Sequence, residues 1–474
     1  MWAGPRPRSP SSSRPRWCEP RRGAITVTEA GDRPAPAFSW AAAAREGLRA
    51  FGIVAAVGVA ASLAVWILAG PAYGFGVALR IGVLYLGAFH HVPIRIEGAF
   101  DIGELTGGVL PNSDLPTQGS SFVEIGIALL SVTVFAGWLL FRAGRRLAGS
   151  GGGSGWAFAL RGAAVAPAYA VAMLLVARLV TIAEPVAFGT LIEGELRVSL
   201  AAGKAFVFPL VIAAAAGGVG GMWAWLASRR DDRRPRSAAA ALAGGLRMLW
   251  VGLALSYAGL FVAGVVQPDD AVAALTPSTA RYFDLVFQRP AVGSAILAHH
   301  LALAPNEAAW VLVPAAGGCD VVRGSEETDL LCYRRFPDLE GGTTAPVVAD
   351  APSPGSTSAF GSAPAGYLLF LLVPAAATVL GGRDAARRRG VTGRAGAAAG
   401  ALAGVAFGAM LGATALLAGV SLVYGGTVGE QGGGGSLWIG PHVPTAMLAG
   451  LVWGVLGGAL GGATASVRSA AAPR

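Results

Sequence analysis

Two adjacent histidine pairs are the residues of this chain best suited to chemistry. They account for four of the five histidines: His90, His91, His299 and His300. An apolar stretch precedes each pair, Gly76–Phe89 in one case and Ala291–Ala298 in the other. Neighbouring residues on a helix point about 100° apart, so one pair is poorly placed to hold one metal ion. If the two segments faced each other, one imidazole from each could bind a metal or a haem iron.

Two other interpretations of the histidine pairs stay open. No carboxylate or thiolate lies at ligand spacing beside them, although Glu307 follows His300. Interfacial histidines commonly hydrogen-bond water and loop carbonyls without any ligand, and histidine also titrates in the range that suits a pH sensor. The sequence therefore offers a metal site as one of three alternatives, and we expect no bound cofactor.

The cysteines predict a disulfide. Cys319 and Cys332 lie in a predicted large outer loop, whereas Cys18 stands alone near the N-terminus. Two cysteines on an oxidising side of a membrane tend to pair, which here would close a short loop around Asp320–Leu331.

Catalytic constellations are missing from the sequence. It contains no Walker motif, no Gly-x-Ser-x-Gly, no His-Glu-x-x-His and no acidic pair placed for hydrolysis. The apolar segments also hold almost no ionisable residue at mid-depth, where ion-coupled transporters usually keep one. We therefore expect no enzymatic activity.

The composition is that of a membrane protein. Of 474 residues, 54% are hydrophobic and only 13% are charged, well below the quarter that is usual in soluble proteins. The net charge of +9 comes mostly from arginines at the ends of apolar segments. Membrane topology explains that distribution, so we expect the lipid bilayer and not nucleic acid as a partner.

Eight segments qualify as spanning helices, which need roughly 20 apolar residues; the sixth is the shortest as written and is expected to begin near Ser362. They are Leu48–Gly70, Phe122–Phe141, Leu160–Ile182, Ala205–Ala227, Leu246–Val266, Gly366–Leu380, Ala397–Leu422 and Val443–Val467. The predicted fold class is an all-α, polytopic transmembrane bundle. The two segments that carry the histidine pairs are predicted to be re-entrant or interfacial outer segments, with a ten-span arrangement as the alternative.

Charge in the connections predicts the orientation. Arginines crowd the loops after the second, fourth and sixth spans, around Arg145, Arg233 and Arg387. The alternate loops lean acidic, with Glu97, Asp101, Glu184, Glu193 and Glu195. Basic loops stay in the cytoplasm, so both termini are predicted to be cytoplasmic in a multi-pass protein of the plasma membrane.

The spans suggest one four-span unit written twice. We expect an Arg/Pro/Ser-rich disordered cytoplasmic tail over 1–44, a first repeat over 45–236, and a second over 237–474 with a large outer loop at 267–361. The histidine-pair segments are matched to each other in this alignment. An even number of spans gives both repeats the same orientation, related by an axis along the membrane normal.

Glycines recur every four residues in the last two spans. They are Gly396, Gly400, Gly404, Gly408 and Gly412, followed by Gly450, Gly454, Gly458 and Gly462. This spacing keeps them near one helix face and lets a neighbouring backbone approach closely. We predict helix packing along these stripes, within the chain or in a homodimer.

The chain resembles uncharacterised Gly/Ala-rich polytopic membrane proteins of actinobacteria. The resemblance rests on the first long span, on Gly87-Ala88-Phe89-His90-His91-Val92-Pro93 and on Phe141-Arg142-Ala143-Gly144-Arg145-Arg146. It implies an architecture and a cell-envelope setting, and no catalytic residue.

These observations favour an envelope scaffold or regulatory membrane protein, with an envelope protein or a second copy as its partner. The alternatives are a permease for a neutral or lipid-like substrate and a metal- or haem-binding membrane protein.

Overall fold

The computed structural model describes residues 38–69, 74–101, 118–149, 153–188, 192–229, 233–266, 290–324, 328–332, 369–428 and 431–466. The chain divides into residues 1–37 and residues 38–474. The predicted tail over 1–44 therefore lies mostly outside the described residues, but its last five residues already belong to the first helix.

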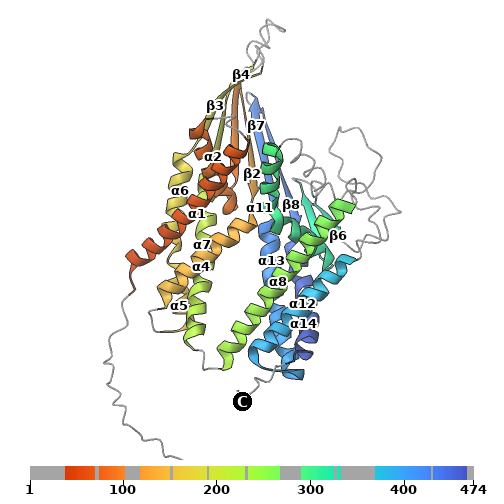
Figure 1. The fold of residues 1–474 in the computed structure, drawn as a ribbon. Coiled ribbons are helices and arrows are strands. Elements are labelled where there is room, and N and C mark those ends of the chain that lie inside the picture. The colour runs from red at the N-terminus through yellow and green to blue at the C-terminus, as the bar shows by residue number, and fades with distance from the viewer. Residues whose placement is uncertain are drawn as a thin grey trace, which may run out of the picture. The chain divides into compact units, whose positions relative to one another are not determined.

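Helices dominate the described residues, and seven helical segments are long and apolar enough to cross a membrane. They comprise α1 (Trp40–Ala69), α5 and α6 together (Gly155–Ala163 and Ala166–Leu179), α7 (Ala202–Ser228), α8 (Arg233–Val266), α12 (Leu372–Arg389), α13 (Gly393–Ala418) and α14 (Val443–Ala463). This content indicates a multi-pass membrane protein. The shorter α4 (Leu130–Ala148) packs along α7 and carries three arginines in its second half (Figure 1).

Two predicted spans differ in detail from the helices, for identifiable reasons. Phe122–Ile127, predicted to open the second span, lies in a strand, and α4 begins only at Leu130. The predicted third span is broken between α5 and α6, where Pro167 occupies the first turn of α6. Proline lacks an amide N–H and fits best in a first turn, so a new helix starts there.

An eight-stranded antiparallel sheet is the main element that the sequence analysis did not anticipate. Its strands are β1 (Ile94–Asp101), β2 (Gln118–Ile127), β3 (Ile182–Phe188), β4 (Ile192–Leu200), β5 (Cys319–Arg323), β6 (Thr328–Cys332), β7 (Val420–Val428) and β8 (Gln431–Pro441). Their order across the sheet is β3-β4-β1-β2-β7-β8-β5-β6. The acidic loops predicted on the outer side supply β1, β3, β4 and the start of β2.

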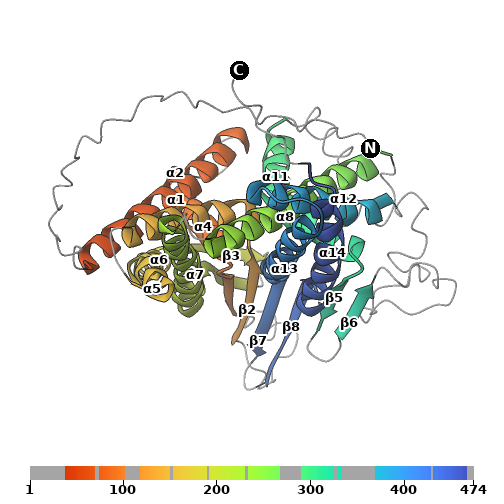
Figure 2. The ribbon, with the colours of Figure 1, turned by 90° about the horizontal axis from the view of Figure 1, so that it is seen from below.

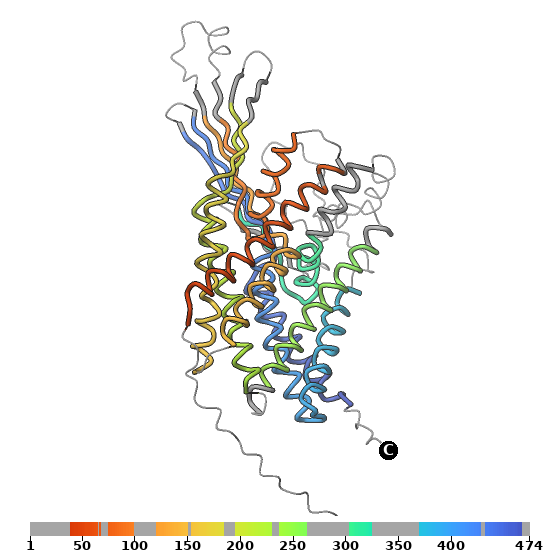
Figure 3. The backbone as a smooth tube through the Cα atoms, turned by 60° about the vertical axis from the view of Figure 1, so that its left-hand side comes forward, coloured from red at the N-terminus to blue at the C-terminus, as the bar shows by residue number. Residues whose placement is uncertain are grey.

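Strands and spans are joined almost without linkers. Ala201 alone separates β4 from α7, His442 alone separates β8 from α14, and Gly419 alone separates α13 from β7. Figure 3 shows the strands rising together from one end of the helices, away from the end where α7, α12 and α14 finish. The arginine-rich ends of α4 and α12 lie at the end of the helices that is farther from the sheet. The sheet and the basic helix ends are therefore separated by the length of the helices.

Two further helices lead into the sheet. α2 (Phe75–Phe89) is too short to cross a membrane, and α11 (Pro290–Ala315) contains Pro305 and Pro314. Ala308, Ala309, Leu312 and Val313 of α11 are buried in the core of the second half. Within the predicted outer loop over 267–361, the described residues 290–324 and 328–332 contain α11 and the paired strands β5 and β6.

The order of elements in residues 40–228 recurs in residues 233–463. Each series runs through two helices, a strand pair, two further helical segments, a second strand pair and a last helix. Close contacts recur as well: a Cβ atom at Gly144 would overlap the backbone of Gly217, and one at Gly382 would overlap that of Gly458. Seen from the helix end in Figure 2, α4–α7 and α12–α14 form neighbouring groups beside strands β2, β7 and β8.

The predicted match between the two histidine pairs is wrong. His91 follows the end of α2 with a left-handed φ of 60°, and Gly317 follows the end of α11 with a φ of 84°. In both places the next amide donates back into the helix, from Val92 to Gly87 and from Gly318 to Val313. His91 therefore corresponds to Gly317, whereas His299 and His300 lie inside α11.

Candidate functional site

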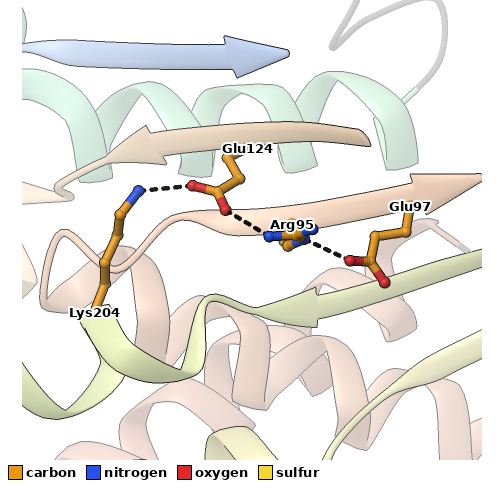
Figure 4. Close-up of polar contacts among 4 residues, drawn as sticks. All are labelled: Arg95, Glu97, Glu124 and Lys204. Atoms are coloured by element: carbon orange, nitrogen blue, oxygen red, sulfur yellow. Dashed lines mark hydrogen bonds and ion pairs between the residues drawn. The ribbon is translucent and has the colours of Figure 1, made fainter. Parts of the chain in front are cut away.

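A cluster of charged residues lies at the base of the sheet, where β1, β2 and α7 meet. Glu124 of β2 accepts hydrogen bonds from Lys204 Nζ at 2.6 Å and from Arg95 Nη1 at 3.2 Å. Arg95 also donates through Nε to Glu97 at 2.5 Å, and its guanidinium stacks 4.7 Å from the Phe122 ring centroid. Figure 4 shows the four charged side chains in one chain of contacts.

The strand register builds most of this cluster. Arg95 and Glu124 stand directly opposite each other on β1 and β2, which puts their side chains on one face. Lys204 reaches them from the first turn of α7, four residues after β4 ends. The Glu124 side chain is only 11% exposed, so its two cationic partners offset the cost of burying the carboxylate. Two acids and two bases make the cluster neutral as a whole.

His90 is buried completely at the end of α2. Its Nδ1 lies 2.7 Å from the Leu86 carbonyl oxygen and its Nε2 lies 2.6 Å from the Tyr169 hydroxyl. The carbonyl can only accept, so Nδ1 carries the proton and Nε2 accepts from tyrosine. Burial lowers the pKa of His90 to about 4, so the ring is neutral at physiological pH. Because both nitrogens are engaged, a metal ion at His90 would have to displace a partner.

His91 occupies a backbone conformation that favours glycine. Its φ of 60° is the sole positive value among the described non-glycine residues, and such a conformation costs roughly 1–2 kcal/mol. The His91 ring centroid lies 6.0 Å from that of Phe208, and its buried Nδ1 has no hydrogen-bond partner within the described structure. Burial, and secondly the charge of Lys204, lower the pKa of His91.

The other two predicted metal residues lie on α11, an element that does not contribute to the charged cluster. His299 and His300 lie in the first half of α11, and their side chains fall outside the described part of the chain. Among the residues that the structure describes, no group of three or more His, Cys, Asp or Glu side chains could hold a metal ion. The metal site at the histidine pairs stays a prediction.

Cys319 opens β5 and is disulfide-bonded. The β5–β6 register sets Cys332 directly opposite it, which is the position that the predicted bond requires. The Cys332 side chain and Cys18 lie outside what is described. A disulfide between these two strands would tie together the two outermost strands on that side of the sheet.

Asp320 follows Cys319 and was not singled out from the sequence. Its side chain is buried, and its Oδ1 has no hydrogen-bond partner in the described structure. Burial raises the pKa of Asp320 well above its ordinary value. No sequence signal marked it, because a single aspartate in a polar segment normally faces solvent.

The glycine stripes lie between α13 and α14. A Cβ at Gly396 would overlap Gly462, one at Gly400 would overlap Gly458, and one at Gly404 would overlap Gly454. These positions let the two helix backbones come close to each other, which supplies the packing that association in lipid depends on.

The polar pair at His90 is not a requirement of the fold. His90 corresponds to Ala316 in the second half, one position before Gly317. Tyr169 corresponds to Phe407, because the amides of these two residues lie against equivalent glycines of α1 and α8, Gly47 and Gly245. The second half therefore forms the same junction with apolar residues.

The charged cluster is likewise confined to the first half. In the second half Val321 and Leu330 stand opposite each other where Arg95 and Glu124 stand in the first. Thr445 takes the place of Lys204, three residues after the junction residue of the last span. The same elements therefore form in the second half without these charges.

The sheet has one polar and one apolar face in its central strands. The polar face includes Arg95, Glu97, Ser120, Phe122, Glu124, Glu195, Arg197, Thr427 and Ser436, as the register requires. The apolar face includes Leu200, Ile94, Ile125, Leu422 and Leu437 in one row and Val198, Ile96, Val123 and Tyr424 in the next. Glu195 and Arg197 are exposed and ion-paired at 2.9 Å on the polar face.

Comparisons with protein families, with curated proteins and with solved structures find no match to this chain.

Proposed function

We propose that this protein is an integral plasma-membrane scaffold that presents its eight-stranded sheet to an envelope protein. The direct junctions between strands and spans carry this proposal. A single residue between a strand and a helix leaves no flexible linker, so the sheet is held in a fixed position on the bundle. A rigid platform with a polar face suits recognition of another protein.

The proposed topology has eight spans, formed by the seven apolar segments and α4. The arginines of α4 and α12, and Arg229 directly after α7, lie at the helix ends away from the sheet, whereas most of the described acids lie on the strands. By the positive-inside rule the basic ends face the cytoplasm together with both termini, and the sheet lies outside. The recurring order of elements supports two parallel four-span repeats.

A non-catalytic role is supported by how the ionisable groups of the described cluster are used. Glu124 holds two cations, and His90 engages both ring nitrogens. Groups committed to partners of this kind position elements and leave no activated nucleophile or base. A metal- or haem-binding role stays the less favoured alternative.

The partner is expected to bind the polar face, where Glu195 and Arg197 are exposed on β4. A photo-crosslinking amino acid at position 195 or at Thr427 should yield one recurrent adduct with an envelope protein in intact cells. With the probe at Thr427, the variant Arg197→Glu should reduce that adduct, because it replaces the Glu195–Arg197 ion pair with two like charges. A probe at Trp156, exposed on α5 at the opposite helix end, is the matched control and should not yield it.

Two outcomes would contradict the scaffold. Adducts with a second copy alone would make the polar face a homodimer interface. Reproducible substrate uptake by vesicles containing the purified protein would favour the permease alternative.

A further inference from the structure

The apolar face of the sheet continues from the membrane spans without a polar break. Leu200, the last residue of β4, is buried against the ends of the helices. Two residues earlier Val198 points to the same face, and Leu196 follows it two residues further from the spans. Residues i, i+2 and i+4 of a strand share one face, so these three form an apolar track that leads away from the bundle.

Neighbouring strands widen this track into a band. Ile94, Ile125, Leu422 and Leu437 lie beside Leu200 in one row across the sheet. The next row holds Val198, Ile96, Val123 and Tyr424. Beyond it the face changes to Gly98, Ser121 and Gly426, so the apolar band stops two to three rows above the spans.

The band is incompletely covered. Ile125 is 37% exposed, Leu196 is 38% exposed and Tyr424 is 49% exposed. One apolar face of an antiparallel sheet normally packs against another layer, because exposed apolar surface costs roughly 25 cal/mol per Å². Something apolar is therefore expected to lie against these side chains.

The bilayer is the apolar medium that adjoins the band. Because β4 passes into α7 through Ala201 alone, the apolar face of β4 directly adjoins the end of a span. We propose that the apolar face binds the acyl chains of lipid drawn from the leaflet on the sheet side. This binding site is independent of the protein-binding role of the polar face.

Photo-crosslinking in defined vesicles tests the site with adjacent residues on opposite faces. The full-length protein, with a photo-crosslinking residue at Leu196 or Tyr424, is reconstituted in phosphatidylethanolamine and phosphatidylglycerol vesicles. Intact-mass measurement should detect lipid adducts at both positions. Probes at Glu195 and Thr427, which point to the polar face of the same two strands, are the matched controls and should give few or none.

A charged residue in the band should weaken lipid capture. Leu196→Glu is expected to lower the lipid adduct at a probe on Ile125 on the order of tenfold, since a carboxylate replaces apolar contact area. Leu196→Met keeps the apolar character and should leave the adduct unchanged. Because Leu196 is partly exposed, both variants are expected to fold, which their melting temperatures check.

The proposal is overturned if positions 196 and 424 give no lipid adduct while a probe at the exposed Leu402 of α13 does. Adducts with another protein or with a second copy at position 196 would overturn it as well. These results concern only the apolar face. Crosslinking of an envelope protein at position 195, on the polar face, tests the scaffold proposal separately.

Discussion

Among single residues, the buried carboxyl of Asp320 makes the clearest prediction about pH. Burial raises its pKa above the ordinary 3.8, so the folded state binds a proton more tightly than the unfolded state. The stability that this group contributes is present below the unfolded pKa, and it is lost as the pH rises toward the folded pKa. The free energy of unfolding should therefore fall over that interval.

Asp320→Asn should raise the melting temperature at neutral pH and flatten this dependence, measured by unfolding in detergent between about pH 4 and pH 8. Glu195→Gln is the control on an exposed strand position. Arg197 lowers the pKa of Glu195, so its effect has the opposite sign and solvent screens it. An unchanged pH profile in the Asp320→Asn variant would show that another group titrates.

The sequence drew attention to the two histidine pairs, but the prediction that they occupy equivalent positions in the two halves was wrong. Two His-His dipeptides look alike in text, whereas the true correspondence of His91 is with Gly317 through backbone conformation. A positive φ usually coincides with glycine, so the histidine at position 91 gave no indication of this backbone conformation. The network around Glu124 was also missed, because its members are separated by up to 109 positions, from Arg95 to Lys204, and only strand pairing brings them together.

Among the elements, the contact between α13 and α14 depends on the absence of side chains. Gly404→Ala should lower the stability of the protein by about 1–3 kcal/mol, because the added methyl overlaps the Gly454 backbone. Gly137→Ala in α4 is the matched control, since a Cβ there meets nothing within 4 Å. Alanine favours helix over glycine, so the control should be neutral or slightly stabilising.

Melting temperatures of the two variants in the same detergent measure the difference. Equal stability of the Gly404→Ala and Gly137→Ala proteins would mean that the two helices can separate without loss.

Hydropathy predicted the helices well and the strands poorly. Apolar runs of spanning length have few alternatives in a protein of this composition, which is why α1, α7 and α14 were anticipated. β7 and β8 carry many glycines, which weaken the strand pattern. In β2 the alternation of Ser121, Val123 and Ile125 with Phe122 and Glu124 runs directly into α4, so the apolar content was assigned to a longer helix.

For the whole molecule, the proposed topology predicts which surfaces are reachable from outside the cell. Thr427→Cys, on the sheet, should react with a membrane-impermeant maleimide in intact cells. Trp156→Cys, at the opposite helix end, should react only after permeabilisation. Both belong in a Cys18→Ser background so that the tail does not contribute. Labelling of Trp156→Cys in intact cells would reverse the orientation and put the sheet in the cytoplasm.

The arrangement of the strands adds a constraint that the spans alone could not reveal. Both halves follow the same order, so the described sheet ends in two unlike edges, β3 on one side and β6 on the other. β3 contains Pro185, which has no amide hydrogen to offer a further strand. A sheet edge of this kind resists uncontrolled growth by addition of another chain.

The one-residue connections between strands and spans also have a mechanical consequence. A connection of one residue, Ala201 or His442, is too short to act as a flexible hinge. A force applied to a hairpin is therefore transmitted as a change in the tilt of α7 or α14. A molecule bound to the sheet would thereby change the position of the far ends of these helices, and a change in bilayer thickness would in turn change how the sheet is held.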